Sequence, residues 1–310
     1  MSDPTPLRRK HPIMTGCLLL VVVGLLFWAA VSFFLGSLLR SSGSDLLGSG
    51  IRKEGVGVVE IRGVIASADQ LVARLREFRE QENIRAIVLR IDSPGGAVGA
   101  SQELFTEVKR TNAVKPVVVS MGSVAASGGL YAALGAEKII ANPGSLTGSI
   151  GVIIKFANLE ELFDKIGYRS ETIKSGELKD IGASGRPMLP AERAMLQEMI
   201  DGVHDQFVAA VVESRGLPES TVRAFADGRI FPGSKALELG LIDGLGNLND
   251  AAMAAAELAG MAPGVMPRLI YPPRRDLSLL TLLLGSRAET RLTPPIHITP
   301  VLAYEWTITP

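Results

Sequence analysis

The chain has 310 residues, and its 32 lysines and arginines balance 32 aspartates and glutamates, so the formal net charge is zero. A neutral chain lacks the positive charge with which nucleic-acid-binding proteins neutralise phosphates, and we therefore expect no nucleic-acid partner. One cysteine and three histidines exclude an intramolecular disulfide and a cysteine-rich zinc site, and 47% apolar residues exclude a disordered chain.

The first predicted element is a transmembrane helix over residues 12–39. This run has no charged residue and is long enough to cross a bilayer with some tilt. The alternatives are a buried core helix or a cleaved signal peptide, but the run is longer than a usual signal-peptide core and lacks a clear cleavage site. Residues 1–11 form a short cytoplasmic head, because Arg8, Arg9 and Lys10 favour a cytoplasmic N-terminus. We therefore predict a single-pass protein of the cell inner (plasma) membrane, with the rest of the chain extracytoplasmic.

The chain after this run shows three compositions. Residues 40–55 are rich in glycine and serine and predict a flexible stalk. Strands and helices then alternate through a domain at 56–262, which is typical of an α/β fold with a parallel sheet covered by helices. Residues 263–310 form a proline-rich tail. The expected strands are 56–64, 86–92, 116–122 and 137–143, followed by a further extended run at 149–156, and the expected helices are 68–81, 100–110, 127–136, 190–215 and 249–260.

Two glycine-rich junctions between strands and helices are candidates for chemistry. In DSPGGAV (92–98), the Pro-Gly-Gly turn leaves backbone amides unobstructed, and such amides can hold a developing oxyanion. In MGSVAASGGLYAA (121–133), small residues surround Ser127 at the start of a predicted helix. Ser127 is either an ordinary helix N-cap or a nucleophile with the Gly128 amide as an oxyanion donor.

A nucleophilic serine needs a base, and no histidine is well placed for that role. His11 precedes the apolar run, His204 lies within a predicted long helix, and His297 lies in the proline-rich tail. A lysine can serve instead if an apolar, partly buried pocket keeps it neutral. Lys174 and Lys179 lie in a glycine- and serine-rich segment, and each is either a solvated loop lysine or this base.

Taken together, five motifs resemble those of the bacterial signal peptide peptidase A (protease IV) family. The resemblance covers about 56–260, with the motifs in the family's order and spacing. The fold it implies is α/β of the Clp protease/crotonase-like type, a superhelix of ββα units. The motifs are IDSPGG (91–96), SVAASGGLY (123–131), TGSIGV (147–152), SGELKDIGASGRPM (175–188) and ADGRIFPGSKALELGLIDGLG (226–246).

The resemblance implies a Ser-Lys dyad, carried over residue by residue. The family's nucleophile falls on Ser127 and its general base on Lys179, while Lys174 matches no catalytic position. Ser149 matches the hydroxyl that orients the lysine. The oxyanion amides fall on Gly95, Gly96 and Gly128, with Gly96 favoured over Gly95.

The implied function is that of a membrane-anchored serine endopeptidase. Its substrates would be cleaved signal peptides and other apolar membrane-associated peptides, and it would need no metal or organic cofactor. The family also implies homo-oligomers whose sites can be built from neighbouring subunits. The apolar run at 277–285 is too short to cross a membrane, and one hypothesis is that it docks on the catalytic groove or on a neighbour.

Three alternatives stay open. A crotonase-type acyl-CoA enzyme is disfavoured by the predicted anchor, since acyl-CoA is cytoplasmic. A Clp-type Ser-His-Asp protease would need a histidine near SIGVIIKF (149–156), where none occurs. A catalytically inactive protease-fold scaffold is weakened because both residues of the implied dyad are present.

Overall fold

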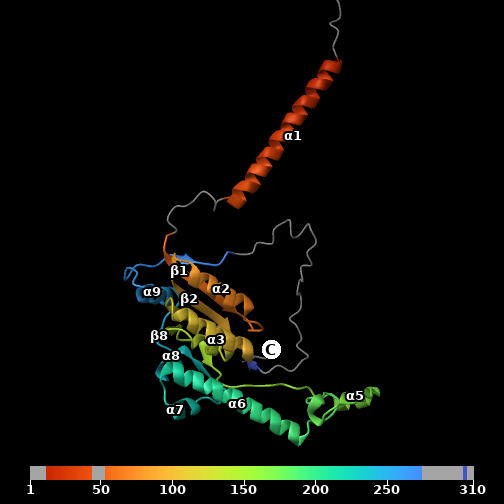
Figure 1. The fold of residues 1–310 in the computed structure, drawn as a ribbon, viewed down its shortest axis with the longest axis vertical. Coiled ribbons are helices and arrows are strands. Elements are labelled where there is room, and N and C mark those ends of the chain that lie inside the picture. The colour runs from red at the N-terminus through yellow and green to blue at the C-terminus, as the bar shows by residue number, and fades with distance from the viewer. Residues whose placement is uncertain (1–11, 44–52, 274–302, 306–310) are drawn as a thin grey trace, which may run out of the picture. The chain divides into compact units, whose positions relative to one another are not determined.

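The computed structural model describes residues 12–43, 53–273 and 303–305, and the chain divides into two compact units after Lys53 (Figure 1). The first unit contains α1 (Pro12–Gly43), whose side chains from Leu19 to Phe34 are exposed. Within the described residues, no helix has both the length and the apolar character that a membrane span needs. The transmembrane helix predicted over 12–39 is therefore not confirmed.

The second unit has the predicted α/β character and is built on an eight-stranded sheet. Its main order is β7-β6-β4-β2-β1-β9, with β5 pairing to both β4 and β8. The pairings are parallel except that between β6 and β7. The strands are β1 (Gly55–Arg62), β2 (Ile84–Ser93), β4 (Val117–Ala126), β5 (Lys138–Ala141), β6 (Leu146–Gly148), β7 (Ile230–Pro232), β8 (Gly244–Leu245) and β9 (Leu269–Ile270).

Helices bury both faces of this sheet, as strand β2 shows. Successive side chains of a strand point to opposite faces. Ile87 and Leu89 accordingly belong to the larger core, and Ala86 and Val88 to a smaller core that includes four alanines of α9 (Leu248–Leu258). The larger core includes side chains of α2 (Asp69–Glu80), α3 (Val98–Asn112) and α4 (Gly128–Ala133), the first two of which run alongside β1 and β2 in Figure 1.

Strand β4 changes its partner along its length, and this change positions the candidate site. Val118–Met121 pair with β5, whereas Val124–Ala126 pair with β6. The sequence predicts that this strand ends at residue 122, but the small residues that follow continue it to Ala126. Ser127 is therefore the first residue beyond a buried parallel strand, directly before α4.

The extended run predicted over 149–156 does not form a strand of the sheet. Ser149 has a φ of 52°, in the left-handed region, and turns the chain away from β6. Within the described residues, Ile153 forms an isolated bridge with Ala303, far along the sequence. The chain then runs through α5 (Glu160–Ile166) and the 3₁₀ helix η1 (Glu177–Asp180), which the sequence analysis did not predict, and α5 projects from the α/β body in Figure 1.

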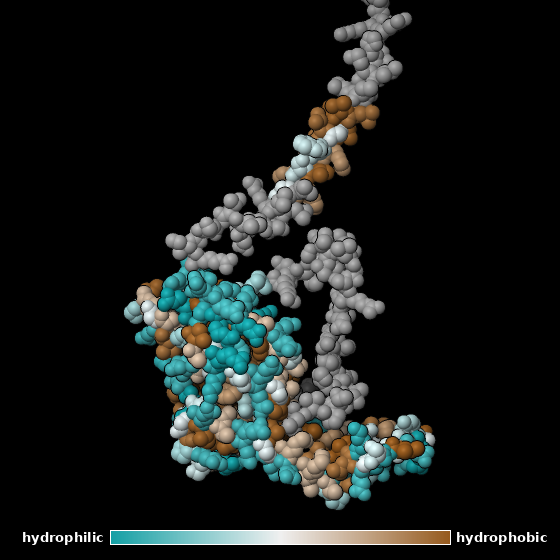
Figure 2. Space-filling view, in the orientation of Figure 1, coloured by the Kyte–Doolittle hydropathy of each residue, from teal (hydrophilic) through white to brown (hydrophobic). Residues whose placement is uncertain are grey.

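Helix α6 (Pro190–Arg215) has the predicted bounds, but most of its buried side chains lie in its second half. Phe207 and Val211 are fully buried, whereas Met195 and Met199 are 38% and 41% exposed. Figure 2 shows apolar side chains around the first half of α6 and the neighbouring α5. The remaining elements are β3 (Gly95–Ala97), α7 (Glu219–Arg223), α8 (Gly233–Glu238) and β10 (Ala303–Glu305).

Candidate active site

The turn of the DSPGG motif lies directly against the residue after Ser127. Gly95 has a φ of 107°, which favours glycine because a side chain is strained in that region. A Cβ atom at Gly95 would lie 2.8 Å from the Gly128 nitrogen and would overlap the carbonyl oxygen of Tyr304. The two glycine-rich motifs, separate in sequence, are therefore neighbours in space.

Ser127 has a strained backbone and a buried side chain without a partner. Its φ of 54° and ψ of −117° are rare for a residue other than glycine. Its N–H donates to the Gly148 carbonyl at 2.8 Å, which fixes the backbone, but the side chain makes no capping hydrogen bond to α4. Ser127 Oγ is the one buried side-chain nitrogen or oxygen in the described part of the chain without a hydrogen-bond partner. The structure therefore does not show the N-cap that was the alternative interpretation.

Gly96 and Gly128 contribute amides to the same small region. A Cβ atom at Gly128 would lie 3.2 Å from the Gly96 nitrogen and 3.2 Å from the Tyr304 carbonyl oxygen, and it would overlap Ser101 Oγ. The Gly96 nitrogen and the Tyr304 carbonyl oxygen therefore both border the space beside the Gly128 Cα, which only glycine leaves open. Such an arrangement has the form of an oxyanion-binding site.

Ser149 lies next to the backbone partner of Ser127. It follows Gly148, whose carbonyl accepts the Ser127 N–H, and it is 6% exposed. Its own N–H donates to the Arg229 carbonyl at 2.7 Å, which holds its left-handed conformation. Ser127 and Ser149 are the two described non-glycine residues with a positive φ. Backbone strain of this kind is concentrated at functional sites.

Lys179 is not brought to Ser127 within this chain. It lies on η1 with an exposed side chain, and its Nζ makes no hydrogen bond or ion pair with the described residues. His204 is also engaged elsewhere, because its Nε2 lies 2.8 Å from the Ala226 carbonyl oxygen. The described part of one chain therefore assembles the serine and the glycines, and leaves the base outside.

Four charged residues hold the turn that carries Lys179. Asp180 accepts hydrogen bonds from Lys174 at 2.6 Å and from Arg186 at 3.3 Å. Arg186 also donates to Glu192, a buried residue at the start of α6. Hydrogen bonds from Arg186 and then Lys174 lower the pKa of Asp180 to about 2, and Arg186 likewise lowers the pKa of Glu192. Lys174 is therefore a structural lysine rather than a free one.

This network predicts that η1 loosens in acid. Because the pKa of Asp180 is lowered from 3.8 to about 2, its stabilising contribution is present above pH 3.8 and is lost as pH falls toward 2. We expect Asp180→Asn to accelerate amide hydrogen exchange of Lys179 and Ile181 at neutral pH, as acid does for the unaltered chain. Asp164→Asn, which alters an exposed pair with Arg169, is the control. Unchanged exchange in Asp180→Asn would contradict this role.

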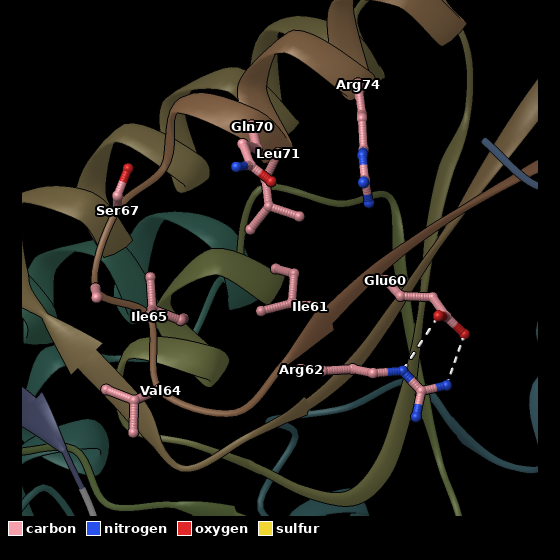
Figure 3. Close-up of a pocket in the computed structure, with 10 residues that line it drawn as sticks. Glu60, Ile61, Arg62, Val64, Ile65, Ser67, Gln70, Leu71 and Arg74 are labelled. Carbon is pink, nitrogen blue, oxygen red and sulfur yellow. Dashed lines mark hydrogen bonds and ion pairs between the residues drawn. The ribbon is translucent and has the colours of Figure 1, made fainter. Parts of the chain in front are cut away.

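A separate pocket lies between β1 and α2 (Figure 3). On the rim of this pocket, Arg62 donates to Glu60 through Nε at 3.1 Å and through a terminal nitrogen at 2.9 Å. No predicted site residue lines this pocket. Ile65, which does line it, exchanges backbone hydrogen bonds with Gly95 and Ala97, and so supports the glycine turn from the side of the pocket.

Sequence comparisons identify the class of protein. The model of peptidase family S49 matches residues 109–262, and the Clp protease model matches residues 59–146. The chain is 47% identical over 206 residues to a putative protease of Synechocystis, an alignment that covers 66% of this chain and 74% of that protein. The fold and these matches define a peptidase. The chain belongs to peptidase family S49, the family of signal peptide peptidase A and protease 4.

Other relatives are consistent with this family. A putative signal peptide peptidase SppA of Enterococcus faecium is 31% identical, over 67% of this chain and 64% of that protein. Protease 4 of Salmonella typhi is 36% identical over 62% of this chain, but the alignment spans 31% of that protein's length. Among solved structures, ClpP1 of Listeria monocytogenes matches with a TM-score of 0.45 and 18% identity, over 63% of this chain and 94% of that chain.

Proposed function

We propose that the chain is a serine endopeptidase with Ser127 as its nucleophile. The observation that carries this proposal is the buried, unpartnered Oγ of Ser127 on a strained backbone, beside the amides of Gly96 and Gly128. A buried hydroxyl without a hydrogen bond costs free energy, and proteins retain such groups mainly at functional sites. The match to family S49 supports the same conclusion.

The proposed mechanism uses Lys179 as the general base. Neutral Lys179 takes the hydroxyl proton while Ser127 Oγ attacks the peptide carbonyl carbon, and the Gly96 and Gly128 amides donate to the oxyanion. The lysine then gives this proton to the leaving amine, and water hydrolyses the ester to a carboxylate and a free serine. Ser149, adjacent to the strand end, is proposed to orient the lysine.

We propose that the base reaches Ser127 from a second copy of the chain. Lys179 is exposed in one copy, whereas a neutral lysine needs an apolar, partly buried environment. The segment around it exposes large apolar side chains that a partner could bury, since exposed apolar surface of this kind marks interfaces. These include Leu162, Ile166, Ile173, which is 99% exposed, and Leu178. A homo-oligomer would complete both the pocket and the dyad.

The proposed substrates are cleaved signal peptides and other apolar, membrane-associated peptides. Support comes from relatives named signal peptide peptidase and from α1, whose described side chains include exposed leucines, valines and phenylalanines. Residues 12–39 are proposed to attach the domain at 56–262 to the inner membrane by way of the stalk at 40–55. The apolar run at 277–285, predicted to dock on the catalytic groove or on a neighbour, lies outside the described residues.

A serine-reactive phosphonate probe tests the proposal directly. The full chain is treated with the probe, digested, and the labelled residue is located by mass spectrometry. We expect the label on Ser127, because an activated serine reacts and a structural serine does not. Labelling of a different serine would reassign the nucleophile. Absence of any label together with absence of peptidase activity would favour the inactive scaffold.

The small-residue requirement at the oxyanion site gives a further prediction. Gly128→Ala places a methyl group 3.2 Å from the Gly96 nitrogen, and we expect kcat to fall by about 10²–10³-fold, as for loss of an oxyanion donor. Gly99→Ala is the control, because a Cβ atom there meets nothing within 4 Å. The double variant Gly128→Ala, Ser101→Gly removes the overlap with Ser101 Oγ and is expected to fold but stay impaired. Near-normal activity in that double variant would contradict the oxyanion role.

A further inference from the structure

Strand β4 bulges opposite Asp92, the first residue of the DSPGG motif. The register of β2 with β4 shifts at this point, so that Asp92 alone faces the three residues 122–124. Extra residues in one strand bend it and redirect the side chains that follow, and such bulges are common beside active sites. Here the bulge lies where β4 passes from pairing with β5 to pairing with β6, shortly before Ser127. The course of the chain into Ser127 therefore depends on this bulge.

The half-buried carboxylate of Asp92 holds this bulge. Its Oδ1 accepts the Val124 N–H at 3.1 Å, which satisfies a backbone amide of the extra residues. The fit is close, because a Cβ atom at Gly122 would lie 2.9 Å from Asp92 Cγ. Ser145, a buried residue directly before β6, donates from its Oγ to the Gly122 carbonyl at 2.5 Å. Side chains therefore fix both ends of the bulge, at Gly122 and at Val124.

The next residue of β2 holds the glycine turn. Ser93 is fully buried, and its Oγ accepts the Gly95 N–H at 3.1 Å. Consecutive side chains of one strand thus hold two different parts of the candidate site. Asp92 holds the strand that leads to Ser127, and Ser93 holds the turn that carries the proposed oxyanion amide. The position of the nucleophile relative to that amide depends on both.

We propose that Asp92 is a positioning residue for the peptidase reaction. By accepting the Val124 N–H it fixes the bulge of β4, and the bulge sets where the strand delivers Ser127 Oγ relative to the Gly96 amide. Because it deepens the proposed function, this role of Asp92 rests on that function. Asp92 transfers no proton in this role. An acceptor oxygen at the place of Oδ1 is what the role requires, and an uncharged acceptor there would serve as well.

Three variants of the full chain test this role through hydrolysis of an apolar peptide. Asp92→Ala removes the acceptor, and we expect kcat to fall by about 10²-fold with KM unchanged, because a small displacement of the reacting atom lowers the rate rather than the binding of substrate. Asp92→Asn keeps an acceptor oxygen and should retain most of kcat. Gly122→Ala keeps the carboxylate but places a methyl group 2.9 Å from its carbon atom, so the carboxylate must shift and kcat should again fall.

Asp243→Ala is the matched control. The Asp243 carboxylate also accepts a backbone amide, that of Ile139 at 2.8 Å, but on β5, which pairs with the first half of β4. We expect Asp243→Ala to lower the free energy of unfolding in urea while the kcat of the folded protein stays unchanged. If Asp92 had only a structural role, Asp92→Ala would behave in the same way.

The rate at which a phosphonate probe labels Ser127 separates this role from the proposed function. Slower labelling of Asp92→Ala and Gly122→Ala than of Asp243→Ala supports the role. Unchanged kcat and labelling in Asp92→Ala, or an Asp92→Asn protein as impaired as Asp92→Ala, overturns the role while the peptidase function stands. If the unaltered protein neither hydrolyses the peptide nor takes the label at Ser127, the proposed function fails, and the role of Asp92 fails with it.

Discussion

The Ser127→Ala protein is expected to lose peptidase activity by at least about 10³-fold while becoming more stable. Ser127 Oγ has no hydrogen-bond partner, so its removal breaks no bond and relieves the cost of a buried, unsatisfied hydroxyl. We expect the free energy of unfolding to rise by about 1 kcal/mol, measured by denaturant unfolding alongside hydrolysis of an apolar peptide.

Ser120 provides the matched control for this substitution. It lies on β4, the strand that leads to Ser127, and is fully buried, but its Oγ accepts a hydrogen bond from Arg90 at 2.8 Å. Ser120→Ala should therefore keep its activity and lose stability, because Arg90 is left without this partner. If Ser127→Ala keeps activity, or if it destabilises the protein as Ser120→Ala does, Ser127 is a structural residue.

The second expected result concerns the base and the copy that supplies it. Lys179→Ala should abolish hydrolysis, whereas Lys165→Ala, which removes an exposed lysine of α5, should not. Mixing Ser127→Ala chains with Lys179→Ala chains should restore part of the activity, because a mixed interface can pair an intact serine with an intact lysine. Hydrolysis rates of the mixture and of each variant alone provide the measurement.

Each outcome of the mixing experiment has a distinct meaning. Near-normal activity of Lys179→Ala alone would show that the dyad is wrongly assigned. Inactive single variants whose mixture stays inactive would show that serine and lysine act within one copy, which would require the η1 turn to move toward Ser127. Restored activity would support the oligomer and explain why Lys179 is exposed in a single chain.

Local patterns predicted most of the regular elements well. Helix α6 has the bounds expected from its apolar spacing, and strands β2 and β5 were expected from short apolar runs. The predictions failed where the burial of a side chain depends on a neighbouring element. Met195 and Met199 follow the helical period yet remain exposed, since burial depends on a neighbouring element and none of the described residues covers them.

The candidate site, too, was predicted only where local sequence preferences are strong. The sequence placed Ser127 between a strand and a helix and placed glycines in a turn, because small residues and Pro-Gly-Gly have strong local preferences. It did not show that the Ser127 side chain makes no capping hydrogen bond to α4, nor that Gly95 lies against Gly128. Tyr304 was missed entirely, because a single tyrosine in a proline-rich tail gives no local signal of strand pairing.

The balanced charge, the scarce histidines and the motif order are properties of the sequence alone, and they were enough to favour a peptidase that uses a lysine. The tertiary structure decided which residues meet. The Ser127 backbone is held by a hydrogen bond to Gly148 of β6, and β3 acquires its paired strand from β10. Backbone pairing across long separations depends on the shape of the whole sheet, whereas a local pattern reports only which conformations a segment can adopt.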